Sequence, residues 1–152
     1  MTDEPRRLEE LDPRESMRLL GSVPLGRIVF TARALPAVCP ARHIVNGDHV
    51  IVRADSGIAI TSAPSGETGT VVAYQADAID PADNLGWSVT VVGMAHQVTD
   101  ATAADAFRRV LRHWAEGGND QVISISPGMV TGFRVVAEGT ARLNDQRQRC
   151  RG

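Results

Sequence analysis

The sequence predicts a mainly β protein, an antiparallel barrel with two short helices at its periphery. Seven segments are rich in β-branched residues and only two have helical periodicity. Two helices are too few for the alternating strands and helices of a parallel α/β sheet. One long predicted strand also carries Gly93 in its interior, where a glycine commonly marks the bend that lets a sheet close.

The first predicted element is a short helix after Asp12. Asp12 suits the N-cap, Pro13 the first helical position and Glu15 the third. We therefore expect the helix to run to about Leu20, with Met17 and Leu20 on its buried face.

The predicted strands form a meander punctuated by glycine, proline and asparagine. They are expected over residues 27–32, 37–45, 49–54, 70–76, 87–98, 121–126 and 129–137. Asn46-Gly47 is a strong hairpin signal, because both residues tolerate the positive φ of a type I′ turn. Ser126-Pro127-Gly128 is interpreted as a turn between the last two strands.

A second helix is predicted from Thr102 to about Trp114. Thr102 and Asp105 resemble a capping box, and a pair of glycines would end the helix. Ala106, Val110 and Trp114 recur at a spacing of four, which places them on one face.

Length and composition indicate one domain, placed at residues 1–137, followed by a flexible polar tail over 138–152. The net charge of −2 gives no basic surface of the kind that nucleic acid or a membrane would select. No apolar run approaches the roughly 20 residues of a membrane helix, and the first residues lack the pattern of a signal peptide. A cytoplasmic location is expected.

No metal site is predicted. Cys39 and Cys150 lack the spacing of a metal site or a redox pair, and two free thiols are expected. The four histidines also lack the spacing of metal ligands.

The candidate binding site follows the hairpin, where the strand 49–54 leads Arg53 into a loop with Ser56 and Gly57. A guanidinium beside the backbone N–H groups that glycine leaves open is suited to a phosphate or carboxylate. The alternative is an exposed strand arginine that pairs with Asp55.

Three other side chains are weaker candidates. Trp87 and Trp114 could stack on a planar cofactor, although large aromatic residues are more often anchors of a core or an interface. His43 is the best of the histidines for a haem or proton-transfer role, with a core or solvent-facing imidazole as its alternative.

Several fragments together carry a family resemblance. They are VPLGRIVFT (23–31), LPAVCP (35–40), NGD (46–48), IVR (51–53), IDP (79–81), GWSV (86–89) and VTGFRV (130–135). In this order the chain resembles the flavin-binding split-barrel proteins related to pyridoxamine 5′-phosphate oxidase, and among them the short actinobacterial members similar to nitroimidazole-resistance proteins. The resemblance covers nearly the whole chain.

The resemblance implies a homodimer of split barrels with two FMN molecules in clefts between the subunits. The flavin ring would perform two-electron chemistry on a small-molecule substrate, with a nicotinamide nucleotide as electron donor and no obligatory protein nucleophile or metal. The strand that carries Arg42 and His43 would pass beside the ring.

Residue by residue, the family's phosphate-binding arginine falls on Arg53 and its loop glycine on Gly57. Its threonine falls on Ala54 and its lysine on Ala59, which follows Ile58. Loss of the lysine alone would weaken FMN binding by about ten- to a hundredfold.

An arginine such as Arg42, Arg27 or one from the other subunit would have to compensate for this loss. The favoured function is therefore an FMN-dependent oxidoreductase with a weakened cofactor site. The alternative is a non-catalytic dimeric barrel that binds a small molecule, haem or a deazaflavin.

Overall fold

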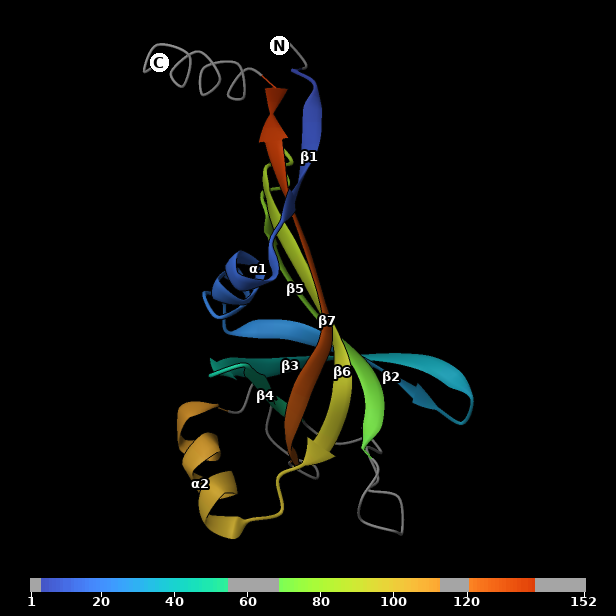
Figure 1. The fold of residues 1–152 in the computed structure, drawn as a ribbon, viewed down its shortest axis with the longest axis vertical. Coiled ribbons are helices and arrows are strands. Elements are labelled where there is room, and N and C mark those ends of the chain that lie inside the picture. The colour runs from blue at the N-terminus through green and yellow to red at the C-terminus, as the bar shows by residue number, and fades with distance from the viewer. Residues whose placement is uncertain (1–3, 55–68, 113–120, 139–152) are drawn as a thin grey trace.

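All strands after the first close into a ring in the computed structural model of the chain (Figure 1). The structure describes residues 4–54, 69–112 and 121–138. Its elements are β1 (Arg6–Leu11), α1 (Pro13–Leu20), β2 (Leu25–Ala32), β3 (Leu35–Asn46), β4 (His49–Ala54), β5 (Thr70–Ile79), β6 (Gly86–Gln97), α2 (Ala101–Val110) and β7 (Gln121–Ala137). Within these ranges no helix has the length and apolar character needed to cross a membrane.

The sheet has the order β1-β7-β4-β3-β2-β5-β6, and β6 pairs with β7 again to close the ring. Each of these pairings is antiparallel. β1 lies outside the ring, paired with the last six residues of β7. The predicted fold class, a mainly β antiparallel split barrel with short peripheral helices, is confirmed.

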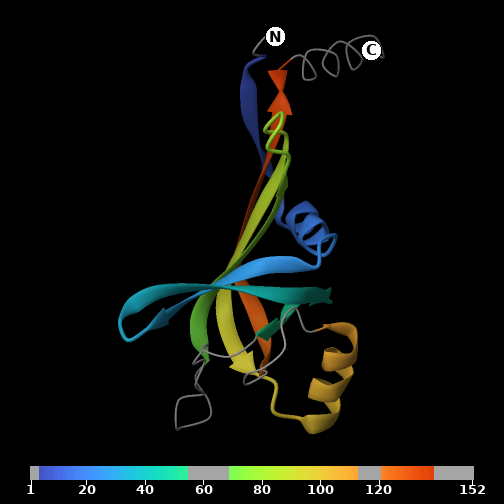
Figure 2. The same ribbon diagram turned by 180° about the vertical axis from the view of Figure 1, so that it is seen from behind.

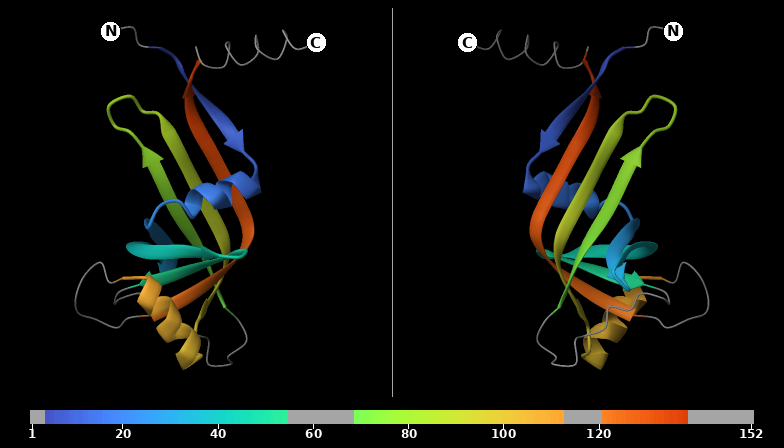
Figure 3. Two further views of the ribbon diagram at one scale, coloured as in Figure 1. Left: turned by 90° about the vertical axis from the view of Figure 1, so that its left-hand side faces the viewer. Right: turned by 90° about the vertical axis from the view of Figure 1, so that its right-hand side faces the viewer.

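The two helices lie on the same side of the ring, and the β2–β3 hairpin projects to the opposite side (Figure 2). Helix α1 lies across β6 and β7, as Figure 3 shows. The two ends of the described chain are adjacent, because the Glu138 amide donates to the Pro5 carbonyl at 3.2 Å.

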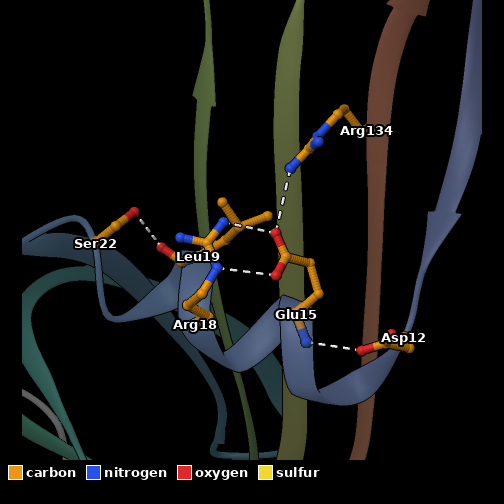
Figure 4. A network of polar contacts seen from close by, with 6 residues as sticks. All are labelled: Asp12, Glu15, Arg18, Leu19, Ser22 and Arg134. Atoms are coloured by element: carbon orange, nitrogen blue, oxygen red, sulfur yellow. Dashed lines mark hydrogen bonds and ion pairs between the residues drawn. The ribbon is translucent and has the colours of Figure 1, made fainter. Parts of the chain in front are cut away.

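Helix α1 begins as the sequence predicts. The Asp12 carboxylate accepts a hydrogen bond from the Glu15 amide at 2.8 Å (Figure 4). The Glu15 side chain turns to Arg18, at 2.6 and 2.9 Å, and to Arg134 on β7 at 3.4 Å. Leu20 is fully buried, so the helix is attached to the barrel by apolar packing on one face and by an ion pair on another.

The main core fills the interior of the ring. Every ring strand contributes to it, and α1 closes it at one place. Its buried members are Leu19, Leu20, Ile28, Phe30, Ala41, Val50, Val52, Ala54, Val72, Tyr74, Ala76, Trp87, Val89, Val91, Ala95, Ile123 and Ile125. Alternate residues of each strand supply these side chains, which leaves the other residues facing outward.

The predicted turn at Ser126-Pro127-Gly128 is wrong, because β7 runs through this segment as one strand. The sequence does interrupt the ladder there: Val92 pairs with Met129 and Gly93 with Pro127, which leaves Gly128 as an extra residue. Proline and glycine mark a bulge here instead of a chain reversal. The predicted irregularity at Gly93 is confirmed.

The predicted start of α2 is also wrong. Its N-cap is Asp100, whose carboxylate accepts from the Ala103 amide at 2.9 Å, so Thr102 already lies inside the helix. The helix ends at Val110, before Trp114, which lies outside the described residues.

The buried face of α2 differs from the predicted stripe. Ala106 and Val110 are exposed, whereas Ala104, Phe107 and Leu111 face the barrel. These three recur at spacings of three and four, the ordinary pattern of a buried helical face. The predicted stripe included Trp114, and this displaced the predicted face by one residue from the observed buried face.

Two further differences concern the strands. β1 was not predicted, because its residues are mostly charged and exposed and its pairing depends on β7. The β3–β4 hairpin is confirmed, but Asn46 pairs with His49 and only Gly47 has a positive φ, so the turn is not of type I′. The predicted tail and the glycine pair after α2 lie outside the described residues.

Candidate functional site

Arg53 is the first predicted site residue, and β4 places it beneath the end of α2. It is 8% exposed, so it is not an exposed strand arginine, and the predicted pairing with Asp55 lies outside the described residues. Nη1 donates to the Arg108 carbonyl at 3.0 Å and to the Leu111 carbonyl. The last carbonyls of a helix carry partial negative charge and lack partners within the helix, so they fix a guanidinium well.

Arg42 lies directly opposite Arg53 in the β3–β4 ladder. Directly paired residues of antiparallel strands project from the same face, so both guanidinium groups belong to the outer face of the ring. Arg42 is partly buried, and its Nε atom is enclosed without a hydrogen-bond partner. The structure therefore brings two cations together, and one has an unsatisfied buried donor.

Helix α2 forms one boundary of this pair. Leu111 packs with Ile51 and Val122 in a small second core on the outer face, joined by Ile44 and Phe107. This apolar contact holds the C-terminal carbonyls of α2 over Arg53. The position of the Arg53 guanidinium thus depends on tertiary packing as well as on its own strand.

A surface pocket adjoins the arginine pair on the opposite side. It is lined by Leu25, Gly26, Arg27, Pro40 and Asp77 and has a volume of about 330 Å³. Leu25 pairs with Arg42 across β2 and β3, and Pro40 precedes Arg42 by two residues on the same face. The volume lies in the range of small-ligand sites.

The pocket rim carries a polar network. Arg27 Nη1 lies 3.8 Å from Asp77 Oδ2 and donates to Gln75 Oε1 at 3.4 Å. Gln75 Nε2 donates to Asp77 Oδ2 at 2.9 Å and to Ser88 Oγ at 3.1 Å. Both signs of charge are thus present at the rim, beside the apolar surfaces of Leu25 and Pro40.

His43, another predicted site residue, faces the interior. Its Nε2 lies 2.7 Å from the Leu20 carbonyl and must be the donor there, since a carbonyl only accepts. In the neutral ring Nδ1 then accepts from the Tyr74 hydroxyl at 2.6 Å, and the single hydrogen of that hydroxyl is shared with the Ala41 carbonyl at 3.0 Å. Burial lowers the pKa of His43, opposed by the backbone hydrogen bond, and burial raises the pKa of Tyr74.

Two other predicted site residues, both in the described part of the chain, do not join the arginine pair. Ala54 and Trp87 pack in the main core. Ser56, Gly57, Ile58, Ala59 and Trp114 lie outside the described residues, so their assignment stays a prediction.

Sequence reasoning missed the pocket residues Leu25, Gly26, Pro40 and Asp77. Proline in a strand was the available signal at Pro40, but the register that brings Asp77 beside it requires the fold.

Comparisons with known proteins identify the family. The family profile described as pyridoxamine 5′-phosphate oxidase matches residues 12–146. The chain belongs to the pyridoxamine 5′-phosphate oxidase family. The resemblance found in the sequence is therefore confirmed.

Individual proteins are similar to the chain along most of their length. The uncharacterized protein Rv0080 of Mycobacterium tuberculosis is 43% identical over 135 residues, 88% of this chain and 89% of the relative. The FAD binding protein from Mycobacterium smegmatis has 28% identity and a TM-score of 0.58, with 84% of this chain and 98% of that chain covered. A FAD-binding protein from Mesorhizobium loti shares the fold at 18% identity, with a TM-score of 0.68 and coverages of 87% and 99%.

The described residues fit a phosphate-bearing ligand. The arginine pair offers an enclosed, unsatisfied N–H donor beside a second guanidinium, a combination that an anion satisfies. The adjoining pocket offers apolar surface for a larger uncharged group.

Proposed function

We propose that this protein is a flavin-dependent oxidoreductase that binds FMN on the outer face of its barrel and acts on a small-molecule substrate. The observation that carries the proposal is the juxtaposition of the buried Arg53 with the pocket at Leu25 and Pro40. Family membership and the FAD-binding description of the M. smegmatis relative support a flavin as the ligand.

Each part of the site has a distinct role in this proposal. Arg53, held by the α2 carbonyls, binds the phosphate, and the pocket beside Pro40 and Leu25 receives the ring system. A bound flavin supplies two-electron redox chemistry, with a nicotinamide nucleotide as the proposed donor. Arg27 and Asp77 orient a polar substrate at the rim, because their charges are fixed against each other and against Gln75.

The proposal includes a homodimer. A row of apolar side chains crosses the outer face of five strands, with each member paired in register to the next: Val38, Val29, Ala73, Val92 and Met129. Val38 and Met129 are 62% and 61% exposed. Val38 precedes Pro40 by two residues on the same face, so a second subunit that covers this row would also form a wall of the pocket.

One observation favours the second candidate function, a non-catalytic barrel that binds a small molecule, haem or a deazaflavin. Nη1 of Arg53 already donates to two backbone carbonyls, and Ala54 has no hydroxyl to add to a phosphate site. A site with fewer donors binds FMN more weakly.

Titration with FMN, FAD and haem separates the two functions. For the oxidoreductase we expect the flavin fluorescence to be quenched at saturation. We also expect the absorption of the bound flavin at about 450 nm to disappear when NADH or NADPH is added without oxygen. The purified protein with Arg14→Ala, an exposed residue on α1, is the charge-matched control for Arg53→Ala. A protein that binds none of the flavins, or binds haem alone, would contradict the oxidoreductase proposal.

A further inference from the structure

Strand β1 is the one strand of the described sheet that pairs with a single neighbour, because it lies beyond the ring along the C-terminal part of β7 (Figure 1). Its first five residues are exposed, and the side chain of Leu8 is 65% exposed. The outer edge of β1 therefore has no strand partner within the described chain. A strand edge of this kind is a template for pairing with another strand.

The alternation of hydrogen bonds shows which backbone groups lie on this outer edge. The Glu138 amide donates to the Pro5 carbonyl, and the β1–β7 register continues from this pair without a shift. Every second pair of an antiparallel ladder is hydrogen-bonded, so Arg7 and Glu9 direct their backbone groups to β7. The residues that direct their backbone N–H and C=O groups to the outer edge are therefore Arg6, Leu8 and Glu10.

The charges of β1 match a reversed copy of the same strand. Antiparallel pairing of two copies about Leu8 places Leu8 opposite Leu8, Arg7 opposite Glu9 and Arg6 opposite Glu10. A centre at Arg7 or at Glu9 would instead place like charges opposite each other, which destabilises a sheet. An edge that uses charge to prevent pairing with its own copies would carry one sign, since like charges would then meet in every register.

We propose that β1 of one copy pairs antiparallel with β1 of a second copy, on a two-fold axis at Leu8. In this register Leu8 pairs with itself, and Arg6 pairs with Glu10, through the backbone groups of the outer edge. Backbone and side chains thus specify the same register. The two β1–β7 pairs would join into one continuous sheet across the two copies.

This contact is separate from the apolar row, and it is weaker than the proposed dimer. It involves one short strand, and the side chains of Arg7 and Glu9 are 45% and 49% exposed. Exposed ion pairs contribute little and are screened by salt, so the pairing requires a higher protein concentration than the dimer and weakens in high salt.

Disulfide trapping at Leu8 tests the two-fold axis. In the proposed register the two Cα atoms of residue 8 lie about 5.5 Å apart, within disulfide range, whereas those of residue 10 lie about 14 Å apart. In a glutathione buffer, Leu8→Cys should therefore form a linked dimer at least about tenfold faster than Glu10→Cys. The wild-type protein gives the background of its two native cysteines, and peptide mass spectrometry identifies the linkage. Equal rates for the two variants would show that β1 does not pair about Leu8.

Charge reversal tests the register. In the Leu8→Cys protein, Arg7→Glu should slow the trapping at least about fivefold, because two pairs of like charges then meet, and Glu9→Arg should do the same. A mixture of these two proteins should recover the rate, since each supplies the charge that the other lacks. Circular dichroism establishes that each variant is folded. A mixture that is trapped no faster than its components would contradict the antiparallel register.

The Val38→Asp background separates this contact from the proposed dimer. Val38 lies on β3, so Leu8→Cys should be trapped equally well when this substitution disrupts the apolar row. Loss of trapping in this background would contradict an independent contact through β1. The readout needs no flavin, so a protein that binds no cofactor but is trapped at Leu8 would contradict the flavin function alone.

Discussion

At the scale of single residues, His43 is defined by its hydrogen bonds. The ring lies between the Leu20 carbonyl of α1 and the Tyr74 hydroxyl of β5, and it is 2% exposed. It therefore connects the first helix to the barrel wall as a neutral group. The sequence placed it on the correct strand, but only the register of β3 shows that its side chain points inward.

A pH-dependent stability follows from the lowered pKa of His43. Below its ordinary value of about 6.5 the unfolded chain takes up a proton that the folded protein does not, so the free energy of unfolding decreases as the pH falls. The decrease approaches about 1.4 kcal/mol per pH unit until the folded pKa is reached, and it is absent above about pH 7.5.

Urea denaturation at pH values from about 8 to about 5, the range in which histidine changes its charge, measures this effect. His43→Gln should remove the dependence of the free energy of unfolding on pH in this range. His49→Gln, on the β3–β4 hairpin, should retain that dependence. Equal slopes in the wild-type protein and His43→Gln would show that another group is responsible.

At the scale of elements, β7 shows why local rules failed. Ser-Pro-Gly is a turn sequence, but here it lies opposite Gly93, and the pair forms a bulge within two continuous strands. Turn propensity describes a segment by itself, whereas pairing with β6 on both sides of the bulge keeps β7 extended. The same limitation explains α2, whose buried face was set by Ile51 and Val122 on the sheet.

The bulge gives a prediction with an internal control. A Cβ at Gly93 would lie 2.0 Å from the Ser126 carbonyl oxygen, whereas one at Gly128 would lie 3.6 Å from the Val92 oxygen. Gly93→Ala should therefore lower the free energy of unfolding by about 1–3 kcal/mol or more, and Gly128→Ala should change it little. Thermal or urea unfolding measures both. Equal losses would mean that the bulge tolerates a side chain at either position.

At the scale of the whole molecule, the sequence predicted the fold class, the family and most strands. The alternation of polar and apolar residues and the positions of glycine and proline are local features, so they can be recognised without the fold. The sequence also indicated Arg53 as a phosphate-binding residue and Arg42 as a substitute cation, and both roles stay predictions. It did not predict the pocket, because Asp77 reaches Arg27 only through the β2–β5 ladder. The sequence also did not predict the burial of Arg53, because that burial depends on which helix covers β4.

The proposed dimer is testable through its apolar row. Val38→Asp and Met129→Asp should each raise the dimer dissociation constant at least about tenfold, because a charge would be buried in the interface. Val110→Asp introduces the same change at a residue 64% exposed on α2, outside the row, and should leave the association unchanged. Sedimentation velocity distinguishes these results. A wild-type monomer, or full dimerisation of both row variants, would contradict the assembly.

The position of β7 at the end of the described chain has a consequence for synthesis. β7 pairs with β1, β4 and β6. These three strands are synthesised earlier, so each has an unpaired edge until β7 has been made. A nascent chain that stops before residue 121 exposes those edges to other chains and to chaperones. Translational pausing just ahead of this strand should therefore increase aggregation more than pausing after it.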